Sequence, residues 1–265
     1  MTTKMPTKTE IRKWIKEMVR PIIKPHSYKI GPNKEFGILF GIHKKTNHYF
    51  ISKLIDITND KKVSVSAFGI RNLLLNTKLI SLTGNEEYKR SFLYYLMETH
   101  PYHKYIIEND FSYRKPIETR EQLEIYFQPL IDNFSNNLKL INHYQYFPNL
   151  LKNWNSIRAD VEKQNSDFFY SRFPSPYSYS QFLYISELLN DNSSSEIFKE
   201  GIKMMEAAIV RMKKKNNLRL IKINEMKIEE LHKVKTYFDN LSQLELEELK
   251  EDFKEFLTPP KTTIT

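Results

Sequence analysis

The N-terminal segment alternates apolar and charged residues with a helical period. Ile11, Ile15, Val19 and Ile23 follow one another at four-residue steps, which places them on one face of a helix. Thr7 and the glutamate three residues after it form a capping-box pattern, in which each side chain reaches a free backbone N–H at the helix start. We therefore expect a helix from about residue 7 to residue 23. A proline at position 21 should kink it or end it.

Three strand-like runs come next, at residues 36–43, 48–57 and 63–70. They are rich in β-branched and aromatic residues, and short polar segments separate them. Connections of this length join antiparallel neighbours, because a parallel crossover needs a dozen residues or more. The pattern predicts an antiparallel β-meander.

The rest of the chain has mostly helical periodicity. Four further hydroxyl residues are followed three positions later by Glu or Gln and predict helix starts: Thr83, Thr119, Ser193 and Ser242. The first of these predicts a helix that carries Tyr88, Phe92, Tyr95 and Leu96. We also expect helices near 148–164, 227–241 and 243–257, the last two joined as an antiparallel hairpin, while 218–223 fits either a strand or a helix.

The predicted fold class is therefore α+β. An N-terminal antiparallel meander packs with helices, and a mostly α-helical C-terminal half ends in a helical hairpin. Two domains, 1–150 and 151–265, are the expected division, with one compact body as the alternative.

Composition removes several classes of chemistry. The 265 residues include no cysteine, which excludes disulfides, thiolate metal ligands and a cysteine nucleophile. The chain has only six glycines and no glycine-rich phosphate loop, nucleophile elbow or His-Glu-x-x-His pair. We expect no cofactor, no metal site and, on balance, no enzyme.

Other features of the chain suggest where the protein works. The start has no apolar secretory segment, and no run is long enough to span a bilayer. We expect a cytoplasmic protein with no membrane partner. Abundant Lys, Asn, Ile and Tyr are typical of an AT-rich, bacterial genome.

The formal net charge of +9 is compatible with an anionic partner. Two segments concentrate the cations. The first predicted helix carries Arg12, Lys13, Lys16, Arg20 and Lys24, and a second run carries Arg211, Lys213, Lys214, Lys215, Arg219 and Lys222. The second run ends a predicted helix, where cations also oppose the helix dipole. Phosphate binding requires several of these charges on one face.

Residues 166–185 hold eight aromatic side chains but only one cation, Arg172. Strand-binding surfaces interleave rings with cations, so this composition favours packing or a protein interface over base stacking. Candidate contact residues for a protein partner are Arg172, Phe173, Tyr177 and Tyr179.

The order of elements carries one resemblance. A helix, the segment RPIIKPHSYKI, a meander and IETREQLEIYFQPLIDNF follow one another within residues 7–150. This layout resembles small bacterial helix–meander–helix domains of unknown function, some of which lie near toxin–immunity or defence genes. The resemblance implies no catalytic residue.

Three functional hypotheses follow. The first is a non-enzymatic protein that acts by binding another protein, as a defence or immunity accessory. The second is a nucleic-acid-binding protein that uses the first helix and residues 211–222. The third is a nuclease or other hydrolase with an unrecognised site.

Overall fold

The computed structural model describes residues 5–96, 116–163 and 178–259. The chain forms two compact units. Unit 1 comprises residues 1–73 and 94–141, and unit 2 comprises residues 74–93 and 142–265. Residues 74–93 thus belong with the C-terminal part of the chain, although they precede the last strand of unit 1. That residues 1–150 and 151–265 form two separate domains stays a prediction.

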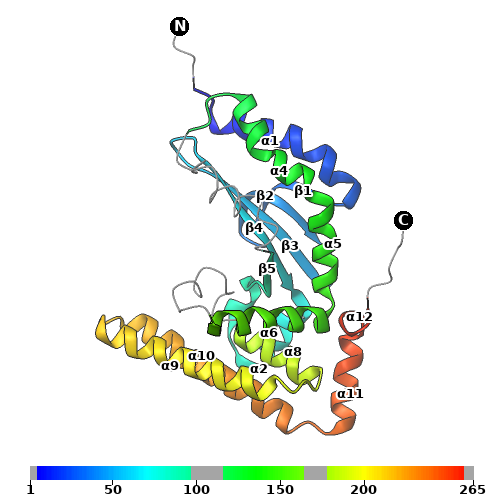
Figure 1. Cartoon of the computed structure of the whole chain (residues 1–265), viewed down its shortest axis with the longest axis vertical. Coiled ribbons are helices and arrows are strands. Elements are labelled where there is room, and N and C mark those ends of the chain that lie inside the picture. Colours follow the sequence, from blue (N-terminus) through cyan, green and yellow to red (C-terminus); the bar gives the residue numbers. More distant parts are fainter. Residues whose placement is uncertain (1–4, 97–115, 164–177, 260–265) are drawn as a thin grey trace. The chain divides into compact units, whose positions relative to one another are not determined.

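Unit 1 is built on a five-stranded antiparallel sheet (Figure 1). Its strands are β1 (Lys29–Asn33), β2 (Ile38–Lys45), β3 (Tyr49–Ile57), β4 (Val63–Asn72) and β5 (Tyr94–Leu96), and they lie in chain order. The three predicted strands correspond to β2, β3 and β4. The sequence did not predict β1 or β5, because β1 contains a Gly-Pro pair and β5 has only three residues.

Helices cover one face of this sheet. They are α1 (Lys8–Ile23), followed by the short 3₁₀ turn η1 (Lys24–His26), α4 (Arg120–Asp132) and the first residues of α5 (Phe134–Gln145). Phe134 packs edge-on against Tyr28 and also contacts Phe68 of β4, and Tyr126 donates a hydrogen bond to the backbone of Val63. The capping boxes predicted at Thr7 and Thr119 are both present. The α1 helix continues through Pro21 to Ile23.

One core position of unit 1 is a lysine. Lys53 of β3 is fully buried, and its sheet neighbours are Ile42 of β2 and Phe68 of β4. Its Nζ has no hydrogen-bond acceptor among the described residues and lies 4.8 Å from the centre of the Phe68 ring. Burial lowers the pKa of Lys53 from 10.5 to about 7, because the charged amine loses its hydration.

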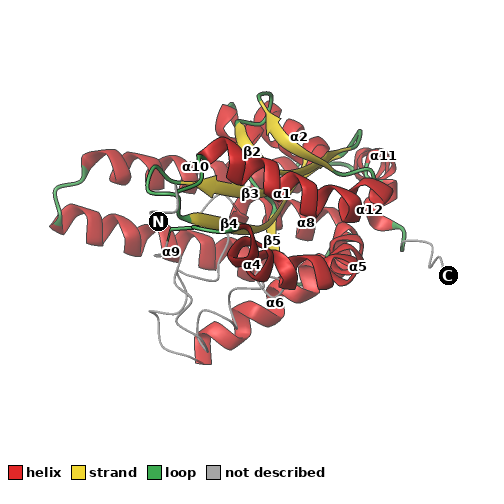
Figure 2. Ribbon diagram, turned by 90° about the horizontal axis from the view of Figure 1, so that it is seen from above, coloured by secondary structure: helices red, strands yellow, loops and turns green. Residues whose placement is uncertain are grey.

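Unit 2 is helical. Its elements are α2 (Leu73–Thr83), the 3₁₀ helix η2 (Glu86–Arg90), α6 (Phe147–Lys163), α8 (Ser178–Leu188), α9 (Ser194–Lys214), α10 (Leu218–Asp239), α11 (Gln243–Asp252) and α12 (Lys254–Leu257). Figure 2 shows α9 and α10 side by side, joined by a short turn at one end. Gly201 lets the two helices approach closely, since a Cβ there would lie 2.8 Å from Leu231.

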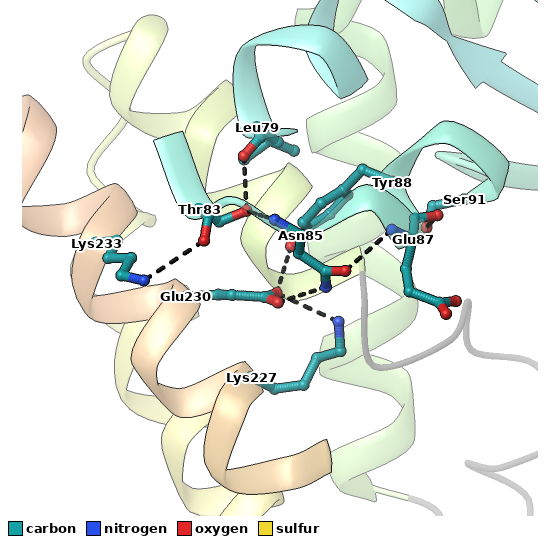
Figure 3. A network of polar contacts seen from close by, with 9 residues as sticks. All are labelled: Leu79, Thr83, Asn85, Glu87, Tyr88, Ser91, Lys227, Glu230 and Lys233. Atoms are coloured by element: carbon teal, nitrogen blue, oxygen red, sulfur yellow. Dashed lines mark hydrogen bonds and ion pairs between the residues drawn. The ribbon is translucent and has the colours of Figure 1, made fainter. Parts of the chain in front are cut away.

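The segment before β5 is tied to α10 by a buried polar network (Figure 3). The carboxylate of Glu230 accepts hydrogen bonds from Asn85 at 2.6 Å and from the Tyr88 hydroxyl at 2.7 Å. Lys227, one turn earlier on α10, donates to the same carboxylate at 3.2 Å. Lys227 and Glu230 are 1% and 2% exposed, so the charges stabilise one another in a site without water. Burial lowers the pKa of Lys227 to about 8, and Glu230 opposes that shift.

The predicted α+β class, with an N-terminal meander and a mostly helical C-terminal half, is confirmed. Two local predictions were wrong. The helix expected to start at Thr83 is instead the end of α2, and Asn85 caps the short helix η2. Residues 218–223, which fitted either a strand or a helix, begin α10. The long hairpin is formed by α9 and α10, one helix earlier than the expected hairpin of 227–241 and 243–257. No helix in the described ranges is long and apolar enough to cross a membrane.

Candidate nucleic-acid interface

The α1 helix separates its apolar and cationic residues onto two adjacent faces. Its apolar row, Ile11, Ile15, Val19 and Ile23, is at most 1% exposed. The cations predicted from the sequence lie beside this row, about 100° further around the helix axis or more, and four of the five are exposed while Lys16 is half-buried. Burial of the apolar row determines how the helix is rotated about its axis. That rotation also turns the cations toward solvent.

A hollow of about 700 Å³ follows this cationic face. It is lined by the five cations together with Thr9, Glu17 and Pro21. We call the residues Arg12, Lys13, Lys16, Arg20 and Lys24 the α1 cation row. Four of them, Arg12, Lys16, Arg20 and Lys24, stand at successive four-residue steps. Each step rises about 6 Å along a helix axis.

The single acidic residue in the hollow does not neutralise the row. Glu17 accepts a hydrogen bond from Arg120 of α4 at 3.0 Å, and Lys13 lies 4.0 Å from its other oxygen. Arg120 also bonds Glu124 at 2.8 Å, and these carboxylates raise the pKa of Arg120 above its ordinary value. Within the described part of the chain, Arg12, Lys16, Arg20 and Lys24 form no ion pair. The row therefore keeps a net positive charge toward solvent.

A buried ring supports the N-terminal half of the row. The Arg12 guanidinium and the Lys16 amine lie 5.6 Å and 5.8 Å from the centre of the Phe40 ring. Phe40 itself is 4% exposed and belongs to β2. Contacts of this kind are attractive and restrict the rotamers of the two cations. A ligand at this face would meet partly ordered charges.

The second basic segment gathers at one end of the α9–α10 hairpin. Arg211, Lys213 and Lys214 occupy the last turn of α9, and Lys215 follows them. Arg219 and Lys222 lie in the first turns of α10, so all six cations predicted from the sequence are brought together and exposed. This segment belongs to unit 2, whereas α1 belongs to unit 1.

Most of the aromatic interface predicted from the sequence lies outside the described residues. Arg172, Phe173 and Tyr177 lie outside the described residues. Tyr179 is 6% exposed on α8, and its ring packs edge-on against Trp154 at 5.6 Å. Trp154 in turn stacks on Phe182, so the described end of the aromatic segment packs inside unit 2.

Sequence reasoning missed the partners that complete the α1 site. Arg120 lies 103 positions from Glu17, and no local pattern links the two. Phe40 was missed as well, because its place in a strand-like run does not indicate that it contacts the cations of α1. Among the described residues, no group of three or more His, Asp or Glu side chains is placed to hold a metal ion.

A comparison with models of known protein families, with curated proteins and with solved structures found no match to this chain.

Proposed function

We propose that this protein binds nucleic acid through the α1 cation row, and that it contacts phosphates rather than bases. The observation that carries the proposal is the α1 cation row, which lines a hollow of about 700 Å³ and in which Arg12, Lys16, Arg20 and Lys24 form no ion pair with any described residue. Neutralisation of phosphates releases condensed counterions, which is the main source of sequence-independent affinity.

The composition of the hollow supports phosphate contacts over base reading. Among the described residues no aromatic side chain lines it, so these residues offer no platform for stacked bases. Its uncharged polar side chain is Thr9 alone among the described lining residues. The described lining therefore has no amide side chain of the kind that reads adenine, and only the guanidinium groups of Arg12 and Arg20 could also contact a guanine.

The proposal is tested by fluorescence anisotropy with labelled duplex DNA, duplex RNA and single strands over a range of salt concentrations. Binding should weaken steeply with salt, since each phosphate contact adds about 0.9 to the slope of log K against log salt. The variant Arg20→Gln with Lys24→Gln removes two cations that contact no ring and form no ion pair within residues 5–96, 116–163 and 178–259. We expect it to reduce that slope by about 2.

The matched control is Lys34→Gln with Lys139→Gln. Both lysines are exposed in unit 1 and lie outside the hollow, so the control removes the same total charge. Equal losses of affinity in the two double variants would show that only net charge matters, and the α1 site would be rejected. Absence of binding at low salt would reject nucleic-acid binding as a whole.

Broader features of the biology stay proposals as well. We propose a bacterial, cytoplasmic protein and keep a defence or immunity role, on the composition and the layout of residues 7–150. A protein partner at Arg172, Phe173 and Tyr177 stays a proposal from the sequence.

A further inference from the structure

The end of the α9–α10 hairpin combines positive charge with exposed apolar side chains. We call residues 210–222 the hairpin tip. It contains six cations and no acidic residue. Val210, Leu218 and Leu220 are 55%, 78% and 38% exposed. Single exposed apolar residues are common, but three at one charged end are more typical of an interaction surface.

A surface of opposite charge lies on α11. Leu244, Glu247, Glu248 and Glu251 follow at steps of three and four and share one face, which we call the acidic stripe. Leu244 is 70% exposed, whereas Leu249 on the other face is 6% exposed. Glu247 pairs with Lys250 of the same helix at 2.9 Å, and Glu251 pairs with Lys254 at the start of α12 at 2.7 Å. Such exposed pairs are weak, so the three carboxylates are available to a partner.

The two surfaces have the same layout with opposite sign. On α9, exposed Val210 is followed three and four residues later by Lys213 and Lys214. On α11, exposed Leu244 is followed at the same spacing by Glu247 and Glu248. An apolar contact flanked by opposite charges is the arrangement that steers and orients two proteins in an interface.

The two surfaces cannot meet within one chain. They lie at opposite ends of α10, which begins in the hairpin tip at Leu218 and ends at Asp239, shortly before α11 (Figure 1). A helix of 22 residues is about 33 Å long, and unit 2 holds the two ends apart along it.

We propose that the hairpin tip of one copy binds the acidic stripe of a second copy. The contact joins two different surfaces of the chain, so two copies can make it twice, tip to stripe in both directions, or successive copies can make it once each in a ring or an open chain. The contact does not involve α1 and is independent of the proposed function.

The test measures the mass of the nuclease-treated, nucleic-acid-free protein by sedimentation velocity as its concentration is raised. We expect association at about 0.05 M salt and a monomer at about 0.5 M salt, where charges are screened within a few ångströms. The tip-reversed variant is Lys213→Glu, Lys214→Glu and Lys215→Glu. The stripe-reversed variant is Glu247→Lys, Glu248→Lys and Glu251→Lys, and it leaves the Ser242–Glu245 cap intact.

Each reversed variant should be monomeric alone, because its two surfaces then carry the same sign. An equimolar mixture of the two should associate, because each supplies the charge that the other lacks. General salt sensitivity would not produce this rescue. Circular dichroism checks that each variant is folded. A milder variant, with Gln in place of the same three lysines, should weaken association at least tenfold.

The Arg20→Gln, Lys24→Gln variant is the control and should associate like the native chain. A native protein that stays monomeric at low salt and high concentration would overturn the proposal. Association of a reversed variant by itself, or a mixture that stays monomeric, would overturn it as well.

Discussion

Replacement of Lys53 by methionine should stabilise unit 1, although it removes a charged residue from a strongly basic protein. Methionine has an unbranched side chain one heavy atom shorter than that of lysine, and it fills most of the same space among apolar neighbours. What it removes is an amine that is fully buried and has no hydrogen-bond acceptor among the described residues. Burial of an unpaired charge opposes folding, and the protein avoids part of that cost by releasing the proton.

The magnitude follows from the pKa. The amine titrates at about 7 in the folded protein and near its ordinary value of 10.5 when unfolded. Between these values the unfolded chain binds more protons, so the free energy of unfolding rises with pH by about 1.4 kcal/mol per pH unit. The full penalty, about 5 kcal/mol, is present below pH 7 and disappears as the pH rises toward 10.5.

The assay is urea unfolding of the native and Lys53→Met proteins at several pH values from 6.5 to 9. The chain has two tryptophans, and Trp14 lies in unit 1 whereas Trp154 lies in unit 2. A Trp154→Phe background therefore reports on unit 1 through Trp14. We expect the variant to be more stable at pH 6.5, with an advantage that shrinks by about 2 to 3 kcal/mol by pH 9.

Lys227→Met is the matched control. That lysine is equally buried, but it donates to Glu230, so its removal leaves a carboxylate without its counter-charge. We expect destabilisation of about 3 kcal/mol or more, opposite in sign to the effect at Lys53. The reasoning would be refuted if the free energies of unfolding of the native and Lys53→Met proteins changed equally with pH. It would also be refuted if Lys53→Met were the less stable protein at pH 6.5.

Three further substitutions test the packing. Glu230→Ala removes the acceptor shared by Asn85, Tyr88 and Lys227, and thermal unfolding should show a loss of about 3 to 5 kcal/mol; a loss below 1 kcal/mol would contradict the network. Gly201→Ala forces a Cβ to within 2.8 Å of Leu231, so calorimetry should show a lower Tm despite the better helix propensity of alanine. Thr7→Ala deletes the α1 capping box and should cost about 1 kcal/mol in urea unfolding, with no effect predicted for Thr9→Ala.

Prediction from sequence succeeded where a feature depends on residues a few positions apart. The capping boxes at Thr7, Thr119 and Ser242 have the predicted bonds. Ser193 shows the limit of that rule, since its hydroxyl bonds Asp191 and makes no helix cap. Asp191, two residues earlier, competes for the Ser193 hydroxyl, and the capping pattern does not take such a neighbour into account.

The same distinction separates the two candidate surfaces. The cations of the first helix were identified from the sequence, and its regular apolar period predicted which side of that helix meets a core. The structure then showed that the cations line one hollow. The acidic stripe and the exposed leucines of the hairpin tip were not predicted as surfaces. Exposure there depends on where α9 and α10 extend past their neighbours, and hydrophobic periodicity does not report that.

The sequence by itself determined the local elements of this protein: the meander, the start of α1 and the apolar face of α1. Only the tertiary structure decided what each residue meets. It placed Lys53 in a core with no acceptor among the described residues, joined Glu17 to Arg120 and brought Glu230 to Tyr88. The reason is physical. Backbone preference and periodicity act over one or two helical turns, whereas desolvation and ion pairing depend on groups that the chain brings together from more than a hundred residues away.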